Sequence, residues 1–327
     1  MVAQCTITVS SPTGSQCPHI TCQEKMANRE LAVGLVFLTQ TTVGILGNFS
    51  LLCHYVLLSF TDYRLKSTDF IHKHLTVGNF LSLLCRGVPQ TMAAFGWKHI
   101  LSHFGCKLLF FLHRVGRGVS IGSICIVSVY QAITISPRNS WWAELKVKAP
   151  KYVVPSIILC WMLQMLVNVI FPLYLTSTSS EKNITNKKDF GYCSSVRHDK
   201  TSASLYAALL SFPDVLCLGL MLWASSTMVL ILYRHKKRVQ HIRRTISSRS
   251  SPESRATKTI LLLLSTFVYF YTLSSVFQVV LSLSDNPSGV LLNITAIMAM
   301  CFPTVSPYLL MSRDPKVPRL CFAWIIK

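Results

Sequence analysis

Acidic residues are scarce in this chain of 327 residues, since 12 Asp and Glu stand against 32 Lys and Arg and give a formal net charge of +20. Catalytic signatures are absent as well: no His-Glu-x-x-His, nucleophile elbow, Walker loop or dinucleotide fingerprint occurs. His72-Lys-His74 lacks matching cysteine or carboxylate ligands, so no metal site is expected there. We therefore expect neither an enzyme nor a bound cofactor.

Long apolar runs are abundant, in a chain that is 51% hydrophobic and only 13% charged. A helix needs roughly 20 mainly apolar residues to cross a bilayer. Seven stretches meet this condition, so the sequence predicts an all-α membrane protein built as a seven-transmembrane helix bundle. The predicted spans are Leu31–Phe60, Phe70–Phe95, Cys106–Ile135, Tyr152–Leu175, Ser204–Tyr233, Lys258–Ser284 and Val290–Met311.

The basic residues gather in alternate loops, which predicts the orientation. The loops around Arg64, Lys146 and Arg243, together with the C-terminal end, hold more than twice as many Lys and Arg as the other loops. By the positive-inside rule the richer side is cytoplasmic, so the N-terminus lies outside and the C-terminus inside. Such a face attracts anionic membrane lipid or acidic protein surfaces, and nucleic acid is not an expected partner.

The predicted topology divides the chain into three parts. Residues 1–30 form an extracellular tail, in which residues 1–25 have no fold of their own; residues 31–311 form the seven-helix domain, and residues 312–327 form a short cytoplasmic tail. A translation start at Met26 is an alternative, because Met26-Ala-Asn-Arg-Glu leads directly into the first span.

Two features in the predicted outer regions suit an oxidising, glycosylating compartment. Asn183-Ile-Thr185 is an N-glycosylation sequon in the loop after the fourth span. Cys106 and Cys193 both lie on the outer side and can pair there, although sequence alone does not establish the pairing. Six further cysteines lie within spans, where they are expected to be small buried apolar residues: Cys53, Cys85, Cys125, Cys160, Cys217 and Cys301.

Ionisable residues within spans are expensive and are therefore candidates for function. Our hypothesis is a polar cavity that is open to the outside and closed by aromatic side chains. The alternative is structural: Asp214 pairs with Arg114 or Arg117 and holds helices together. An excess of arginine over aspartate would favour anionic or acceptor-rich small ligands. The candidate lining residues are Arg86, Phe110, His113, Arg114, Arg117, Tyr206, Phe212 and Asp214.

A basic helical extension follows the fifth span on the predicted cytoplasmic side. Its composition suits a docking surface for a cytosolic partner, and the alternative is an anchor to lipid headgroups. The candidate contact residues there are Arg234, His235, Lys236, Lys237 and Arg238.

The seven spans, the outer N-terminus and Gly47-Asn48 resemble a G-protein-coupled receptor, but the usual signatures of the rhodopsin-like group are missing. The third span ends in Tyr130-Gln131-Ala132 instead of an acidic-Arg-Tyr triplet, and Ser306-Pro307 replaces Asn-Pro in the seventh span. The motifs that stand instead resemble the vomeronasal type 1 receptors over nearly the whole chain. They include His113-Arg-Val-Gly-Arg117-Gly, Gln131-Ala-Ile-Thr-Ile-Ser-Pro137, Lys148-Ala-Pro-Lys-Tyr152, Gly191-Tyr-Cys193, Trp223-Ala-Ser-Ser-Thr-Met-Val229, Arg238-Val-Gln-His-Ile242 and Ser251-Pro-Glu-Ser-Arg-Ala-Thr257.

This resemblance implies a plasma-membrane chemoreceptor of sensory neurons that detects pheromone-like small molecules and signals through an inhibitory-class G protein. It also implies a disulfide between Cys106 and Cys193 and a glycan on Asn183. It supplies no ligand contacts, so the cavity residues rest on the charge argument. The alternatives are a bitter-taste-type chemoreceptor and, from a different class, a membrane channel or transporter, which would conduct without a G protein.

Replacement of Gln131 is expected to alter signalling. Because the acidic-Arg-Tyr switch is missing, another contact must hold the third helix in the inactive state, and we place it at Tyr130 and Gln131. Gln131→Ala should change basal or ligand-evoked G-protein activation, compared with the parent chain at equal surface amounts. Unchanged basal and evoked signals would contradict this role.

Overall fold

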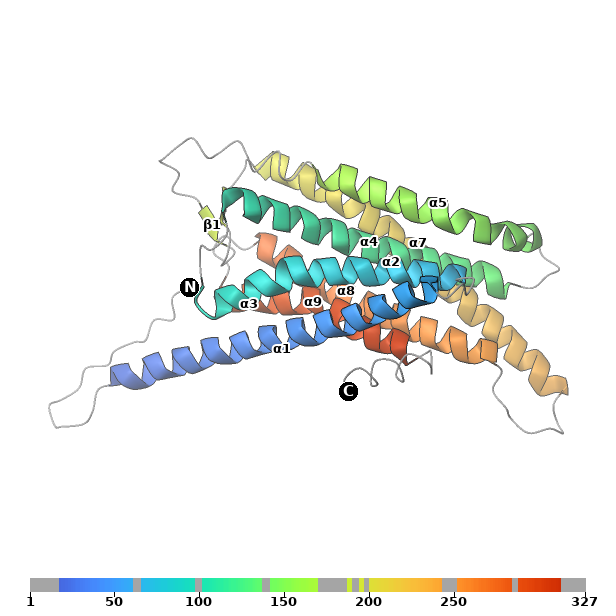
Figure 1. The fold of residues 1–327 in the computed structure, drawn as a ribbon, viewed down its shortest axis with the longest axis horizontal. Helices are drawn as coiled ribbons and strands as arrows, with labels where there is room; N and C mark the ends of the chain where they lie inside the picture. The colour runs from blue at the N-terminus through green and yellow to red at the C-terminus, as the bar shows by residue number, and fades with distance from the viewer. Residues whose placement is uncertain are drawn as a thin grey trace.

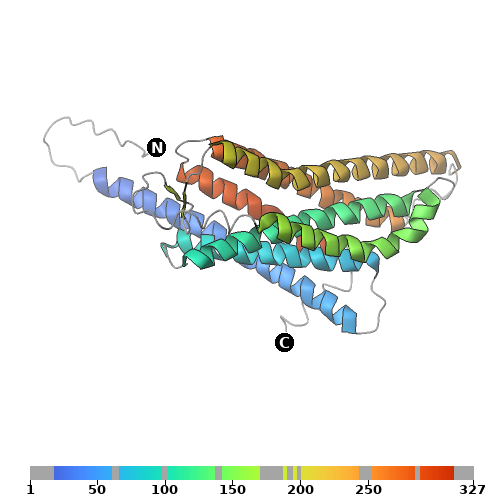
Figure 2. The same cartoon turned by 90° about the horizontal axis from the view of Figure 1, so that it is seen from above.

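A computed structural model describes residues 18–60, 66–97, 102–136, 142–169, 187–189, 194–196, 200–242, 252–283 and 288–312. Long helices run side by side along the molecule's long axis, and the N-terminal part of α1 extends beyond the others (Figures 1 and 2). The elements are α1 (Pro18–Phe60), α2 (Ser67–Ser82), the π-helical segment η1 (Leu83–Gly87), α3 (Val88–Ala94), α4 (His103–Ile135), α5 (Trp142–Asn168), β1 (Lys187–Asp189), β2 (Ser194–Val196), α7 (Lys200–Ile242), α8 (Pro252–Leu283) and α9 (Gly289–Met311).

Within the described part of the chain, five helical segments are long and apolar enough to cross a membrane, so this is a multi-pass membrane protein. They match the predicted first, third, fourth, fifth and seventh spans: Asn28–Phe60, Phe104–Ile135, Glu144–Asn168, Phe212–Arg234 and Gly289–Met311. The predicted second span consists of α2, η1 and α3 in direct succession. The sixth contains the shorter apolar segment Leu261–Phe277. The count of seven spans and the orientation stay predictions.

Three elements differ from the sequence-based expectation. Helix α1 begins at Pro18, so residues 18–25 are helical and the expectation that they have no fold is wrong; proline suits a first helical position, and residues 23–27 are the helix formers Gln, Glu, Lys, Met and Ala. Helix α5 ends at Asn168, and residues 170–175 lie outside the described part of the chain. The short antiparallel hairpin of β1 and β2, with Lys187 opposite Val196, was not predicted. Most of the C-terminal tail, residues 313–327, also lies outside the described residues.

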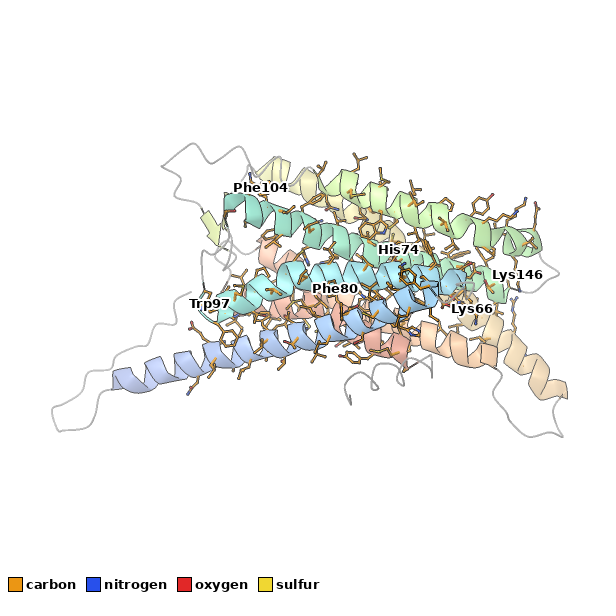
Figure 3. All side chains as sticks on the ribbon, in the orientation of Figure 1. Lys66, His74, Phe80, Trp97, Phe104 and Lys146 are labelled. Atoms are coloured by element: carbon orange, nitrogen blue, oxygen red, sulfur yellow. The ribbon has the colours of Figure 1, made fainter. Side chains whose placement is uncertain are left out.

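Labelled residues that flank two of the connections lie at opposite ends of the bundle. Trp97 and Phe104, which flank the connection between α3 and α4, lie at one end, and Lys66 and Lys146 lie at the other (Figure 3). At the first of these ends Ser102 caps α4, because its side chain accepts a hydrogen bond from the Gly105 amide at 3.1 Å.

Helix α4 is the centre of the bundle and packs against α2, α5, α7 and α8. It is the most buried of the five span candidates. Ile121, Ile124 and Cys125 of α4 join a cluster of buried residues to which α1, α2, α7, α8 and α9 also contribute. The core of the protein therefore surrounds the middle of α4.

Two glycines allow α2 and α4 to lie unusually close together. A Cβ on Gly116 would lie 2.8 Å from the Gly78 carbonyl oxygen, and one on Gly78 would lie 2.7 Å from the Gly116 carbonyl oxygen. Real side chains do not make such contacts with backbone, so both positions require glycine. Ser82 and Ser120 follow each glycine by four residues, which gives the small-xxx-small pattern of closely packed membrane helices.

The prolines of α9 are accommodated by a polar side chain from α1. Pro307 has no N–H, so the Pro303 carbonyl four residues earlier loses its helical partner. Asn48 supplies the missing donor, with its Nδ2 atom 2.9 Å from the Pro303 oxygen. Within a bilayer no water would replace that bond, so this contact fixes α1 against α9.

Gly116→Ala is expected to destabilise the protein by about 1 to 3 kcal/mol, because the added methyl group forces α2 and α4 apart. Thermal unfolding of the detergent-purified chain, together with its surface expression, measures the loss. Gly219→Ala is the matched control, since nothing lies within 4 Å of a Cβ at that helical glycine. Equal stability of the two variants would contradict the close packing of α2 and α4.

Candidate functional site

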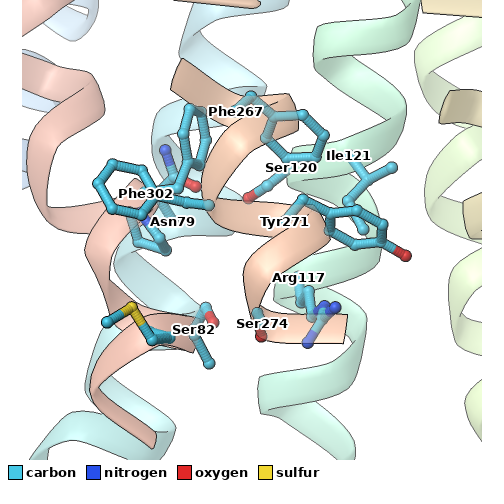
Figure 4. A pocket seen from close by; sticks show the side chains of 13 residues that line it. Asn79, Ser82, Arg117, Ser120, Ile121, Phe267, Tyr271, Ser274 and Phe302 are labelled. Atoms are coloured by element: carbon cyan, nitrogen blue, oxygen red, sulfur yellow. The ribbon is translucent and has the colours of Figure 1, made fainter. Parts of the chain in front are cut away.

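A cavity of about 40 Å³ lies between α2, α4, α8 and α9. Polar side chains and aromatic rings share its walls, and Figure 4 shows the side chains of the lining residues. In that view Arg117, Ser82 and Ser274 lie toward one end, whereas Asn79 and Ser120 lie nearer to Phe267 and Phe302. The lining residues are Asn79, Ser82, Arg117, Ser120, Ile121, Phe267, Phe270, Tyr271, Ser274, Met298, Ala299, Phe302 and Pro303.

Among the described residues that line the cavity, Arg117 is the only charged one. Its guanidinium carbon lies 5.1 Å from the centroid of the Tyr271 ring, which is the geometry of a cation–π contact. The Tyr271 hydroxyl in turn donates a hydrogen bond to Asp214 Oδ2 at 2.9 Å. Tyr271 therefore contacts both Arg117, through its ring, and Asp214, through its hydroxyl. These are the cation and the carboxylate that the sequence analysis assigned to one cavity.

This arrangement differs from the direct ion pair that the structural alternative required. The hydrogen bond recorded for Asp214 comes from Tyr271, and the ion pair found among the described residues is Lys148 with Glu144. Because aromatic rings do not cancel a charge, Arg117 keeps its attraction for an anion or for strong hydrogen-bond acceptors.

Arg86 and His113 form a second polar group beside the cavity. The Arg86 Nη1 atom lies 3.3 Å from His113 Nε2, and Ser82 Oγ lies 3.0 Å from His113 Nδ1. Arg86 belongs to η1, and such π-helical turns within α-helices often occur at functional sites. Ser82 lines the cavity, so it joins the Arg86–His113 pair to the wall that contains Arg117.

Arg114 forms a hydrogen bond to α5. Its Nε atom donates to Asn168 Oδ1 on α5 at 2.9 Å, and Asn168 itself donates to the Gln164 carbonyl at 2.8 Å. This contact links α4 to the end of α5, and Arg114 is not among the lining residues of the cavity.

The predicted aromatic residues contribute less than expected. Phe110 is half-buried and does not line the cavity. Phe212 is 66% exposed, so its predicted place in the site is corrected: it lies on the outer surface of α7. Tyr206 belongs to α7, but its side chain is outside the described part of the structure.

The aromatic wall instead comes from α8 and α9, which the sequence-based hypothesis left out. Phe267, Phe270, Tyr271 and Ser274 line the cavity at positions i, i+3, i+4 and i+7 of α8. That spacing is one face of a helix, and it is the sequence signal that could have found them. In the sequence alone, however, these four α8 residues look like the usual composition of a membrane span. They stand out only once Phe302 of α9 is known to face them. The centroids of the Phe267 and Phe302 rings lie 4.8 Å apart.

The candidate cytoplasmic residues fall on two elements. Tyr130 packs against a buried cluster around Val127 and Ile157, and Gln131 is buried on α4. Arg234 and Lys237 are exposed near the end of α7. The remaining three, His235, Lys236 and Arg238, belong to α7, but their side chains lie outside the described residues.

The expected burial of the span cysteines is confirmed for Cys85 and Cys125 and is wrong for Cys53, which is exposed; Cys160, Cys217 and Cys301 are partly buried. All six span cysteines are free thiols, and Cys106 at the start of α4 is disulfide-bonded. Cys193 and the sequon residue Asn183 lie outside the described residues, so the partner of Cys106 and the glycan stay predictions.

The comparison with known proteins covers nearly the whole chain. A family model described as the vomeronasal organ pheromone receptor family matches residues 31–323. Vomeronasal type-1 receptor 4 of Homo sapiens is 60% identical over 300 residues, which are 91% of this chain and 99% of that protein. Vomeronasal type-1 receptor 2 of Homo sapiens is 58% identical over 87% of this chain and 72% of its own length. Vomeronasal type-1 receptor 3 of Homo sapiens is 52% identical over 90% of this chain and 95% of its own length.

Tyr271→Phe is expected to lower the unfolding temperature, because it leaves Asp214 without the hydroxyl donor while it keeps the ring beside Arg117. The loss should correspond to about 0.6 to 2 kcal/mol. Tyr269→Phe is the control, since Tyr269 is 63% exposed on the same helix. Indistinguishable unfolding of the two variants would show that the Tyr271–Asp214 bond does not contribute to stability.

Proposed function

The chain belongs to the vomeronasal type 1 receptor family, and from that premise we propose that it is a plasma-membrane receptor for pheromone-like small molecules that activates an inhibitory-class G protein. Members of this family are chemoreceptors rather than enzymes, with a small-molecule ligand and a G protein as their general partners. To these general properties of the family the proposal adds the plasma membrane as the location, the chemistry of the ligand, the residues that bind it and the inhibitory class of the G protein.

The observation that supports the ligand chemistry is Arg117 in the wall of the cavity, without a carboxylate among the other lining residues. A guanidinium offers several N–H donors in a fixed fork and binds carboxylate, sulfate or carbonyl oxygens. The aromatic side chains Phe267, Phe270 and Tyr271 offer an apolar surface next to it. Such a wall suits the acidic or acceptor-rich end of a small, otherwise apolar molecule.

Arg86 and His113 extend the polar wall toward the same ligand in our proposal. Their mutual contact at 3.3 Å adds donors and positive charge adjacent to Ser82, which lines the cavity. Arg114 is assigned a structural role, because its recorded hydrogen bond joins α4 to Asn168 of α5. Asp214 acts through Tyr271, whose ring it positions beside Arg117.

The G-protein contact is proposed at the opposite end of the molecule from the hairpin. Exposed Arg234 and Lys237 lie where α7 ends, and that end of the bundle also carries Lys66 and Lys146 (Figures 1 and 3). Basic side chains there suit an acidic protein surface. Tyr130 and Gln131, near the end of α4, lie inside the bundle and are proposed to hold α4 in the inactive state.

The outer side is completed by two covalent features in our proposal. Cys193 is the partner that we assign to Cys106, and Asn183 carries the glycan. Such a bridge would tie the loop that contains β1 and β2 to the start of α4.

The direct test is ligand-evoked G-protein activation in cells that express the full chain, with sulfated, carboxylated and neutral small molecules, with and without a blocker of the inhibitory class. Arg117→Ala should abolish the response to acidic ligands while surface expression is kept. Arg117→Lys should retain part of it, because the charge stays but the planar fork is lost.

Gly219→Ala serves as a control, since nothing lies within 4 Å of a Cβ at that position and it belongs to neither proposed contact, so its response should be unchanged. A normal response of Arg117→Ala would remove Arg117 from the ligand site. Blocker-insensitive signals would assign another G protein, and current without a G protein would support a conducting protein instead.

A further inference from the structure

The cavity holds a positive charge for which its own walls provide no counter-charge. Arg117 lines it, and no Asp or Glu is among the lining residues. The carboxylate of Asp214 bonds to the Tyr271 hydroxyl, and Arg117 contacts the ring of that tyrosine. An ionised group within the membrane needs a partner of opposite sign or dense hydrogen bonding to offset its desolvation.

Two buried polar atoms of cavity-lining residues also have no hydrogen-bond partner. Ser274 is 3% exposed and its Oγ atom is unpartnered, and Asn79 is 1% exposed with an unpartnered Oδ1 atom. The amide nitrogen of Asn79 is occupied, since it donates to Ser306 Oγ at 2.8 Å. Unmet hydrogen bonds of this kind are costly in an apolar environment, so both atoms indicate a ligand in the cavity.

The chemistry of the two atoms specifies that ligand. The Ser274 hydroxyl and the Arg117 guanidinium are both donors to an anion. Asn79 Oδ1 is an acceptor and needs a donor, which a water molecule bound to the same anion supplies through its second hydrogen. A monatomic anion with a water molecule therefore satisfies both unpartnered atoms and the positive charge.

The size of the cavity agrees with this composition. Its volume of about 40 Å³ has room for about three water-sized groups. A chloride ion is larger than a water molecule but is a single atom, so one chloride and one or two waters fit, and an organic ligand would enter this space with its acidic end.

We propose that chloride occupies this cavity in the ligand-free receptor, bound by Arg117 and Ser274 and bridged by water to Asn79. The inference rests on the proposed function in one respect: an acidic ligand group that approaches Arg117 takes the place of the chloride. Agonist affinity should then fall as chloride rises, while the stability of the ligand-free receptor increases.

The first test measures stability without any agonist. The full chain in lipid nanodiscs is heated at constant ionic strength while gluconate, which is too large for the cavity, is replaced stepwise by chloride. The unfolding temperature should rise with chloride and saturate, because only a bound ion stabilises by mass action.

Ser274→Ala should raise the half-saturating chloride concentration about tenfold or more, because it removes a hydrogen bond to a charged group. Ser123→Ala is the matched control: Ser123 is fully buried and its Oγ atom is also unpartnered, but it does not line the cavity. Its chloride dependence should equal that of the parent chain. Arg117→Gln should abolish the dependence, and if this variant does not fold, the serine pair still decides the outcome.

An unfolding temperature that is the same in chloride and gluconate would overturn the proposal, as would equal effects of Ser274→Ala and Ser123→Ala. Agonist titrations separate this inference from the proposed function. If Arg117→Ala loses its response to acidic ligands while chloride has no effect on stability, the receptor site stands and the chloride site fails. If chloride stabilises through Ser274 while Arg117→Ala responds normally, the ligand assignment fails and the anion site stands.

Discussion

The close approach of α2 and α4 at Gly78 and Gly116 is the constraint on which the site depends. With no side chain at either position, the backbones touch, and the next residues of both helices are carried to the same depth. Asn79 follows one glycine and Arg117 follows the other, and both line the same cavity. In a bilayer this contact cannot rely on the hydrophobic effect, because lipid tails are as apolar as the helices, so close packing is what holds the two elements together.

Near that contact a backbone carbonyl receives a hydrogen bond from a side chain, whereas the positive charge of Arg117 is not paired with a carboxylate among the cavity-lining residues. Asn48 takes the carbonyl that Pro307 releases, which secures α9 against α1 and positions Phe302 and Pro303 in the cavity wall. Arg117 is treated differently: a tyrosine ring stands beside it, and the carboxylate is bonded to the hydroxyl of that tyrosine. A direct ion pair would have made a stronger internal link and a weaker binding site for an anion.

The candidate site was predicted in part. Ionisable residues within spans are rare because placing them in a bilayer costs free energy. That rarity was enough to select Arg86, His113, Arg117 and Asp214 as candidates. The contacts among them were not predictable, since which face of a helix meets which neighbour depends on rotation, and a single residue of rotation turns a side chain by about 100°. Phe212 illustrates the error, because an aromatic two residues from Asp214 lies on the outer surface of the same helix.

The sequence by itself determined that the chain is a helical membrane protein, roughly where its apolar helical segments lie, and to which family it belongs. Those properties depend on local composition and on motifs that are contiguous in the chain. The tertiary structure decided that the cavity lies between α2, α4, α8 and α9. It also decided that Tyr271 contacts both Arg117 and Asp214, and that Arg114 forms a hydrogen bond to Asn168 of α5. These are contacts between residues far apart in sequence, and packing rather than pattern selects them, because apolar spans carry little periodicity to show which face turns inward.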